Sequence, residues 1–176
     1  IHPLHRDPFW TINLVGVILI QSIFTDHRMK RKSDKFISLQ IAGLQGLYWM
    51  IFCPIFSFAS VYLLSKGFTN QKIGWVMACS SVAAIILQPA LGSLIDRYKQ
   101  YSSKFVMTCM TVICLALLCG VIWLNVGMLG MAIMYVGVLA LLLTMQPLVN
   151  ALTFEYINAG YNVSFGMTRA AGSILF

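Results

Sequence analysis

The side chains best suited to chemistry in this sequence are Asn150, Glu155 and Arg169, because each lies in or beside a long apolar run. A cation such as Arg169 is costly inside a membrane helix unless it faces water, a carboxylate or a polar ligand. We therefore interpret Arg169 as a ligand-binding residue. The alternative is that its long side chain only reaches out to the membrane interface.

Asn150 and Glu155 offer different chemistry. The Asn150 amide can donate and accept, which suits a polyhydroxylated solute, although a hydrogen bond between helices would use the same groups. Glu155 follows five positions later. It can pair with Arg169, balance nearby loop cations, or take up a proton.

These side chains must be held by long apolar segments. No charged residue lies between Lys35 and Lys66, between Lys72 and Asp96, or between Lys104 and Glu155. A membrane span needs roughly 20 predominantly apolar residues. The sequence therefore predicts an all-α polytopic membrane protein with helices at about 36–63, 73–95, 104–124 and 128–154, and a further helix that begins near 165 and is cut off at 176.

The charge pattern predicts the orientation. We interpret Met29 as the native start and residues 1–28 as a translated leader; the alternative is a genuine extra helix in that segment. With Met29 inside, only Lys66 and Lys72 fall outside, which follows the positive-inside rule for a cytoplasmic N-terminus. Eight cations are then cytoplasmic: Arg28, Lys30, Arg31, Lys32, Lys35, Arg97, Lys99 and Lys104.

Composition argues against several other classes of function. The chain is 59% apolar and 10% charged, with a net charge of +7. Its cations cluster beside apolar runs, so lipid headgroups are the expected neighbours rather than nucleic acid. The cysteine spacings fit no metal site, and we expect no cofactor. All histidines precede the predicted helices, which leaves no His–carboxylate or His–Cys arrangement for an enzyme: His2, His5 and His27.

Two motifs carry a resemblance to a known family. The segment 67–74 (GFTNQKIG) and the later pattern Gln88-Pro89-x-x-Gly92-x-x-x-Asp96-Arg97 resemble the major facilitator superfamily. They are particularly similar to its oligosaccharide:proton symporters, the lactose permease group, and to the phenylpropionate permeases. By this resemblance, Gly92 permits close approach of helices, while Asp96 and Arg97 belong to a cytoplasmic gate.

The pattern Phe165-Gly166-x-x-Arg169-x-x-Gly172 is similar to the start of helix 5 in the lactose permease group, where the corresponding arginine contacts the sugar. There the arginine pairs with a carboxylate on helix 4. Here Asn150 occupies roughly the matching place, and Glu155 resembles a second carboxylate nearer the cytoplasm. This departure from the pattern weakens any inference of galactoside specificity.

The resemblance implies a secondary active transporter of a small polar or organic solute, sugar-like or aromatic-acid-like, that works by alternating access. Such proteins have about 12 helices in two halves. It implies that residues 29–176 form part of the N-terminal six-helix half, that the C-terminal half is missing, and that a proton is the coupling ion. We expect a multi-pass protein of the plasma or inner membrane. The alternative function is a non-transporting helical subunit with a structural or signalling role.

Overall fold

The computed structural model describes residues 34–97, 103–124 and 126–174, and these are helical with no strand among them. The suggested leader 1–28, most of the basic segment that follows it and the loop segment that contains Lys99 lie outside the described residues. The helices are α2 (Asp34–Ser57), α3 (Ala59–Ser65), α4 (Asn70–Arg97), α5 (Ser103–Trp123), α6 (Met128–Asn158) and α7 (Phe165–Ile174).

Four of these helices, α2, α4, α5 and α6, are long and apolar enough to cross a membrane. The shortest, α5, has 21 residues. At about 1.5 Å per residue it is roughly 30 Å long, which matches the hydrocarbon core of a bilayer. The bounds of α4, α5 and α6 lie within a few residues of the ranges expected from the apolar runs.

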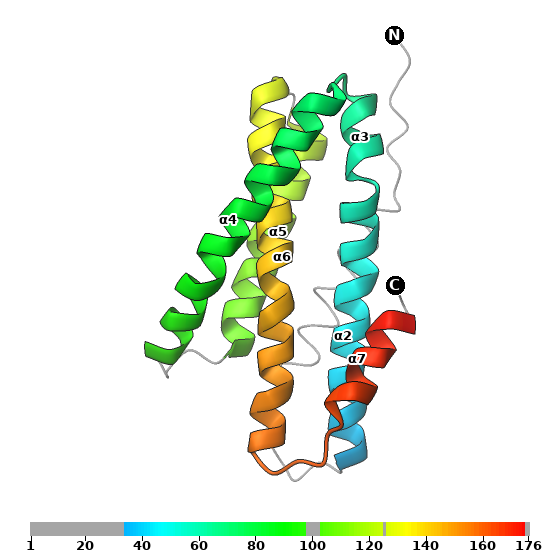
Figure 1. Ribbon diagram of the computed structural model, residues 1–176, viewed down its shortest axis with the longest axis vertical. Coiled ribbons are helices and arrows are strands. Elements are labelled where there is room, and N and C mark those ends of the chain that lie inside the picture. The colour runs from blue at the N-terminus through cyan, green and yellow to red at the C-terminus, as the bar shows by residue number, and fades with distance from the viewer. Residues whose placement is uncertain (1–33, 98–102, 125, 175–176) are drawn as a thin grey trace.

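Helix α6 forms the centre of the bundle. It packs against both α4 and α5, while the short α7 lies along the lower part of α2 (Figure 1). Val138 and Leu139 of α6 are completely buried in the apolar core. A Cβ added at Gly137 would lie 3.0 Å from Leu117 Cδ1, so the missing side chain lets α5 approach α6 closely.

The first helix differs from its expected single range of about 36–63. The structure divides it at Phe58 into α2 and α3. Pro54 precedes the break, and proline removes one helical hydrogen bond and clashes with the carbonyl four residues earlier. Phe58 N–H still donates to the Pro54 carbonyl at 3.2 Å, so α3 continues the general course of α2.

Two glycines end helices with positive φ angles. Gly67 has φ of 86° and follows α3, while Gly160 has φ of 88° and follows α6. After α3, the N–H groups of Gly67 and Phe68 donate to the carbonyls of Leu64 and Leu63, which is the Schellman arrangement. Glycine suits these positions because side chains disfavour positive φ.

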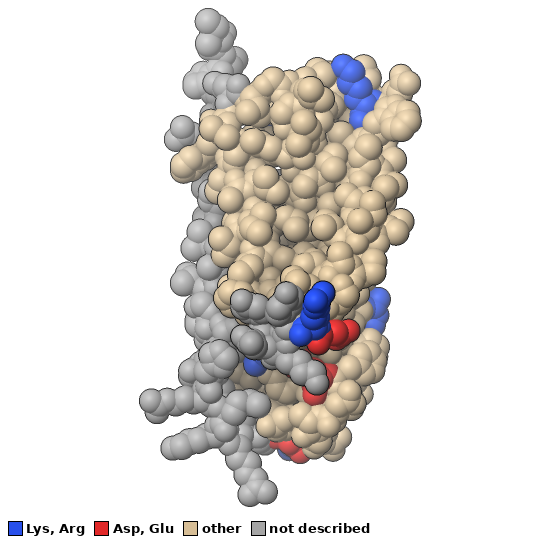
Figure 2. All heavy atoms as spheres, turned by 90° about the vertical axis from the view of Figure 1, so that its left-hand side faces the viewer, with Lys and Arg blue, Asp and Glu red and all other residues tan. Residues whose placement is uncertain are grey.

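Apart from Arg169, which lies beside Trp49, the described charged residues lie toward the two ends of the bundle. Lys66 and Lys72 lie at the end where α3 meets α4, and Asp34, Asp96 and Glu155 lie toward the opposite end. Figure 2 shows one face of the molecule, with charged side chains near both ends and an uncharged band between them. This distribution fits a protein whose middle lies in hydrocarbon and whose ends lie in water.

Candidate functional site

Helix α2 presents two neighbouring side chains to the predicted site residues. Gln45 and Trp49 are four residues apart, so they lie one turn apart on the same side of the helix. Gln45 contacts Asn150 of α6, and Trp49 contacts α7 beside Arg169. The structure therefore connects Asn150 and Arg169 through α2.

Gln45 and Asn150 form a hydrogen bond between helices. Gln45 Nε2 donates to Asn150 Oδ1 over 2.9 Å. Gln45 is only 1% exposed, while Asn150 is half-buried. The contact satisfies a buried amide, which would be costly to leave unpaired. It also leaves the Asn150 amide nitrogen available to a ligand at the half-buried edge of the pair, since no described residue accepts from it.

Arg169 lies against an aromatic ring. Its guanidinium carbon is 6.0 Å from the centroid of the Trp49 ring, which is within cation–π range. No carboxylate among the described residues lies within ion-pair distance of Arg169. Contact through one face of the guanidinium leaves its N–H groups, which point outward in the plane, to bind oxygen atoms of a ligand.

Gly172 allows this arrangement. A Cβ added there would lie 2.5 Å from Trp49 Cδ1 and 3.6 Å from the Gln45 carbonyl oxygen. Any larger residue would therefore push α7 away from Trp49. Gly172 lies about one helical turn after Arg169 on α7. Its close contact with the Trp49 ring therefore also places Arg169 beside that ring.

Glu155 faces another part of the bundle. Ser103 Oγ donates to Glu155 Oε2 over 3.1 Å, and the glutamate is exposed. The suggested ion pair with Arg169 is absent from the structure. The reason is geometric: Glu155 lies near the end of α6 on the side of α5, whereas Arg169 packs on α2. Its other two suggested roles stay open.

Gly92, Asp96 and Arg97 lie in the last turns of α4, next to the loop segment 98–102. Asp96 and Arg97 are exposed, and neither forms an ion pair with another described residue. A Cβ added at Gly92 would meet no heavy atom within 4 Å. The close approach expected at Gly92 is therefore absent among the described residues in this conformation.

Neither Gln45 nor Trp49 was among the site residues predicted from the sequence. A signal for Gln45 was present, since it is an uncharged polar residue in the middle of an apolar run. Nothing local identified Trp49 as the neighbour of Arg169. Within the described ranges, no group of three His, Cys, Asp or Glu residues is placed to hold a metal ion.

Comparison with known families shows which superfamily the chain belongs to. The model of the MFS_1 like family matches residues 40–176, which include every site residue discussed above. The chain belongs to the major facilitator superfamily. No curated protein and no solved structure matched the chain.

Membership of the major facilitator superfamily confirms the prediction of an all-α membrane protein. It also indicates a transporter rather than an enzyme. Within the superfamily, the lactose permease and phenylpropionate permease branches remain a resemblance carried by the motifs around Asp96 and Arg169.

Proposed function

We propose that this major facilitator protein is a secondary active transporter of a small polar or organic solute, either sugar-like or aromatic-acid-like. The observation that carries the proposal is the guanidinium of Arg169, held on Trp49 without a described carboxylate partner. An arginine in this setting gains most when a polar ligand supplies the missing acceptor. The proposal is supported by membership of a transporter superfamily.

In this proposal, Arg169 from α7 and Asn150 from α6 bind the solute beside the same side of α2. Arg169 supplies a planar set of donors, and Asn150 supplies the amide group that Gln45 leaves free. The Trp49 ring holds the guanidinium in place and offers an aromatic surface, which suits stacking with a sugar or an aromatic acid.

Transport would follow alternating access, with two halves rocking about the bound solute. Residues 29–176 would belong to the N-terminal half, and a C-terminal half would complete the site. Gly92, Asp96 and Arg97 would form part of the cytoplasmic gate. Glu155 would serve as a proton site or as a partner of cytoplasmic charges, and a proton would be the coupling ion. The protein would lie in the plasma or inner membrane with its N-terminus in the cytoplasm.

The decisive test is Arg169→Lys in the full-length protein, with a solute chosen from an uptake screen of sugars and aromatic acids. Lysine keeps the charge but loses the planar donors. An unpaired polar ligand group costs roughly 1–3 kcal/mol, so affinity should fall by about 5- to 150-fold. Isothermal titration calorimetry at matched protein concentration measures the change.

Lys35→Arg is the control, because it exchanges the same two side chains at an exposed helix end outside the proposed site and gate, and it should leave solute affinity unchanged. If Arg169→Lys binds with wild-type affinity, Arg169 does not contact the solute. If the screen finds no transported solute at all, the non-transporting subunit becomes the better description.

A further inference from the structure

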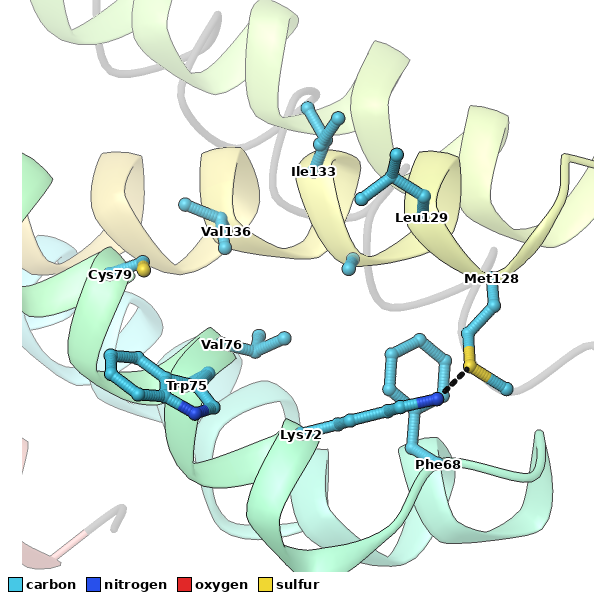
Figure 3. Close-up of a pocket in the computed structure, with 10 residues that line it drawn as sticks. Phe68, Lys72, Trp75, Val76, Cys79, Met128, Leu129, Ile133 and Val136 are labelled. Carbon is cyan, nitrogen blue, oxygen red and sulfur yellow. Dashed lines mark hydrogen bonds between the residues drawn. The ribbon is translucent and has the colours of Figure 1, made fainter.

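A groove with a volume of about 620 Å³ opens between α4 and α6, far from Arg169 (Figure 3). Its walls are almost entirely apolar. Trp75, Val76 and Cys79 line it from α4, and Leu129, Ile133 and Val136 line it from α6. Both helices are long enough to span a membrane, so most of this groove lies beside the hydrocarbon of the bilayer.

One cation lies at the mouth of the groove. The Lys72 side chain extends toward Met128, and its Nζ donates to Met128 Sδ over 3.1 Å (Figure 3). A thioether is a weak acceptor, so this contact does little to compensate an ammonium group. No carboxylate among the described residues lies within ion-pair distance of Lys72.

The groove has a defined depth in the membrane. Lys72 is the third residue of α4 and Met128 is the first residue of α6, so the mouth lies where both helices begin. The partial positive charge of a helix N-terminus adds to that of Lys72 there. From Lys72 to Cys79 the groove follows about two helical turns, or roughly 10 Å, toward the membrane centre.

We propose that this groove binds an anionic phospholipid of the surrounding bilayer, with its phosphate on Lys72 and the start of an acyl chain along α4 and α6. The charge at the mouth and the apolar walls match the two parts of such a lipid in the order in which the bilayer presents them. Trp75 is 66% exposed on the rim, and tryptophan is enriched at the level of the headgroups. The proposal is independent of the solute site.

Tryptophan fluorescence tests the proposal directly. Trp75 is kept in the full-length protein, every other tryptophan is replaced by Phe, and the protein is reconstituted in phosphatidylcholine with brominated acyl chains, which quench on contact. Adding unbrominated phosphatidylglycerol should restore the fluorescence more than adding unbrominated phosphatidylcholine does. We expect a preference of about fivefold, as for one cation near an anionic headgroup.

Lys72→Gln should abolish this preference, and Lys72→Arg should keep it. Lys66→Gln is the matched control, because Lys66 lies at the same end of the bundle but over the Tyr62 ring rather than the groove. Equal losses in Lys72→Gln and Lys66→Gln would overturn the proposal in favour of general surface attraction.

A second measurement tests the proposal even if the single-tryptophan protein misfolds. Native mass spectrometry of the protein with all its tryptophans should show phosphatidylglycerol retained by the wild type and by Lys66→Gln, and lost from Lys72→Gln. If brominated lipid fails to quench Trp75, another helix or a second copy of the protein covers the groove, and the proposal is wrong.

Discussion

The role of a single side chain in this protein depends on which residue of a neighbouring helix it contacts. Asn150 and Arg169 lie on different helices, and each contacts a residue of α2 within one turn of the other. Gln45 donates a hydrogen bond to Asn150 Oδ1, and the Trp49 ring covers one face of the Arg169 guanidinium. This leaves the donors of both residues for a ligand. Gly172 makes the second contact possible because it has no Cβ to meet the Trp49 ring.

At this scale we predict coupling between Gln45 and Asn150. Asn150→Leu alone should destabilise the protein by about 1 kcal/mol, because it leaves the Gln45 amide unpaired; measured hydrogen bonds between membrane helices average about 0.6 kcal/mol. The double variant Gln45→Leu/Asn150→Leu should lose less than the sum of the single variants. Equilibrium unfolding of all four proteins in mixed micelles measures this cycle, and additive losses would contradict the coupling.

The same variants separate the two roles of Asn150. In the Gln45→Leu background the hydrogen bond is already gone, so Asn150→Leu changes solute affinity only if Asn150 itself binds solute. Unchanged affinity in that background would make Asn150 a purely structural residue.

At the scale of the helices, α4 supplies a hydrogen bond that a proline removes from α6. Pro147 of α6 has no N–H to donate to the carbonyl of Leu143, four residues earlier. Gln88 of α4 donates its side-chain amide to that same carbonyl, with Nε2 and the oxygen 3.3 Å apart. The two helices are therefore connected at the point where α6 lacks a hydrogen bond of its own.

We predict that Gln88→Leu destabilises the protein by about 1 kcal/mol, because the Leu143 carbonyl then lacks a donor within the membrane. In a Pro147→Ala background the helix supplies its own N–H, so the same Gln88→Leu change should cost much less. Thermal unfolding of the four combinations checks this. An equal cost in both backgrounds would mean that Gln88 stabilises α6 by some other contact.

For the whole molecule, the direction of the helices determines what lies on each side of the membrane. The α3–α4 turn and the α6–α7 turn are separated by α4, α5 and α6, each long enough to span. Three crossings place the two turns on opposite sides. Combined with the excess of cations expected on the side of Lys35, Arg97 and Lys104, this leads us to predict that the α6–α7 turn is cytoplasmic.

The measurement is cysteine labelling with a membrane-impermeant maleimide in a background without other cysteines. Ser65→Cys, at the exposed end of α3 next to the α3–α4 turn, should react in intact cells. Ser164→Cys, in the α6–α7 turn, should react only after the membrane is opened. The reverse result would invert the orientation, and reaction of both from one side would rule out three crossings.

The sequence by itself determined the four long apolar helices. Uncharged apolar runs of span length are local features, and the hydrophobic effect acts on them wherever the helices later pack. The predicted range 104–124 therefore lies close to α5 at Ser103–Trp123. The motif around Asp96 likewise indicated the correct superfamily.

Only the tertiary structure decided which side chains contact one another. Gln45 and Asn150 are 105 residues apart, and Gln88 and Leu143 are 55 apart, so no local pattern reveals that they meet. Glu155 lies 14 positions before Arg169 in the sequence, yet the turn after α6 carries α7 to α2 while Glu155 stays beside α5. Helix periodicity states which residues share a face, but the packing of one helix on another decides which side chain that face meets.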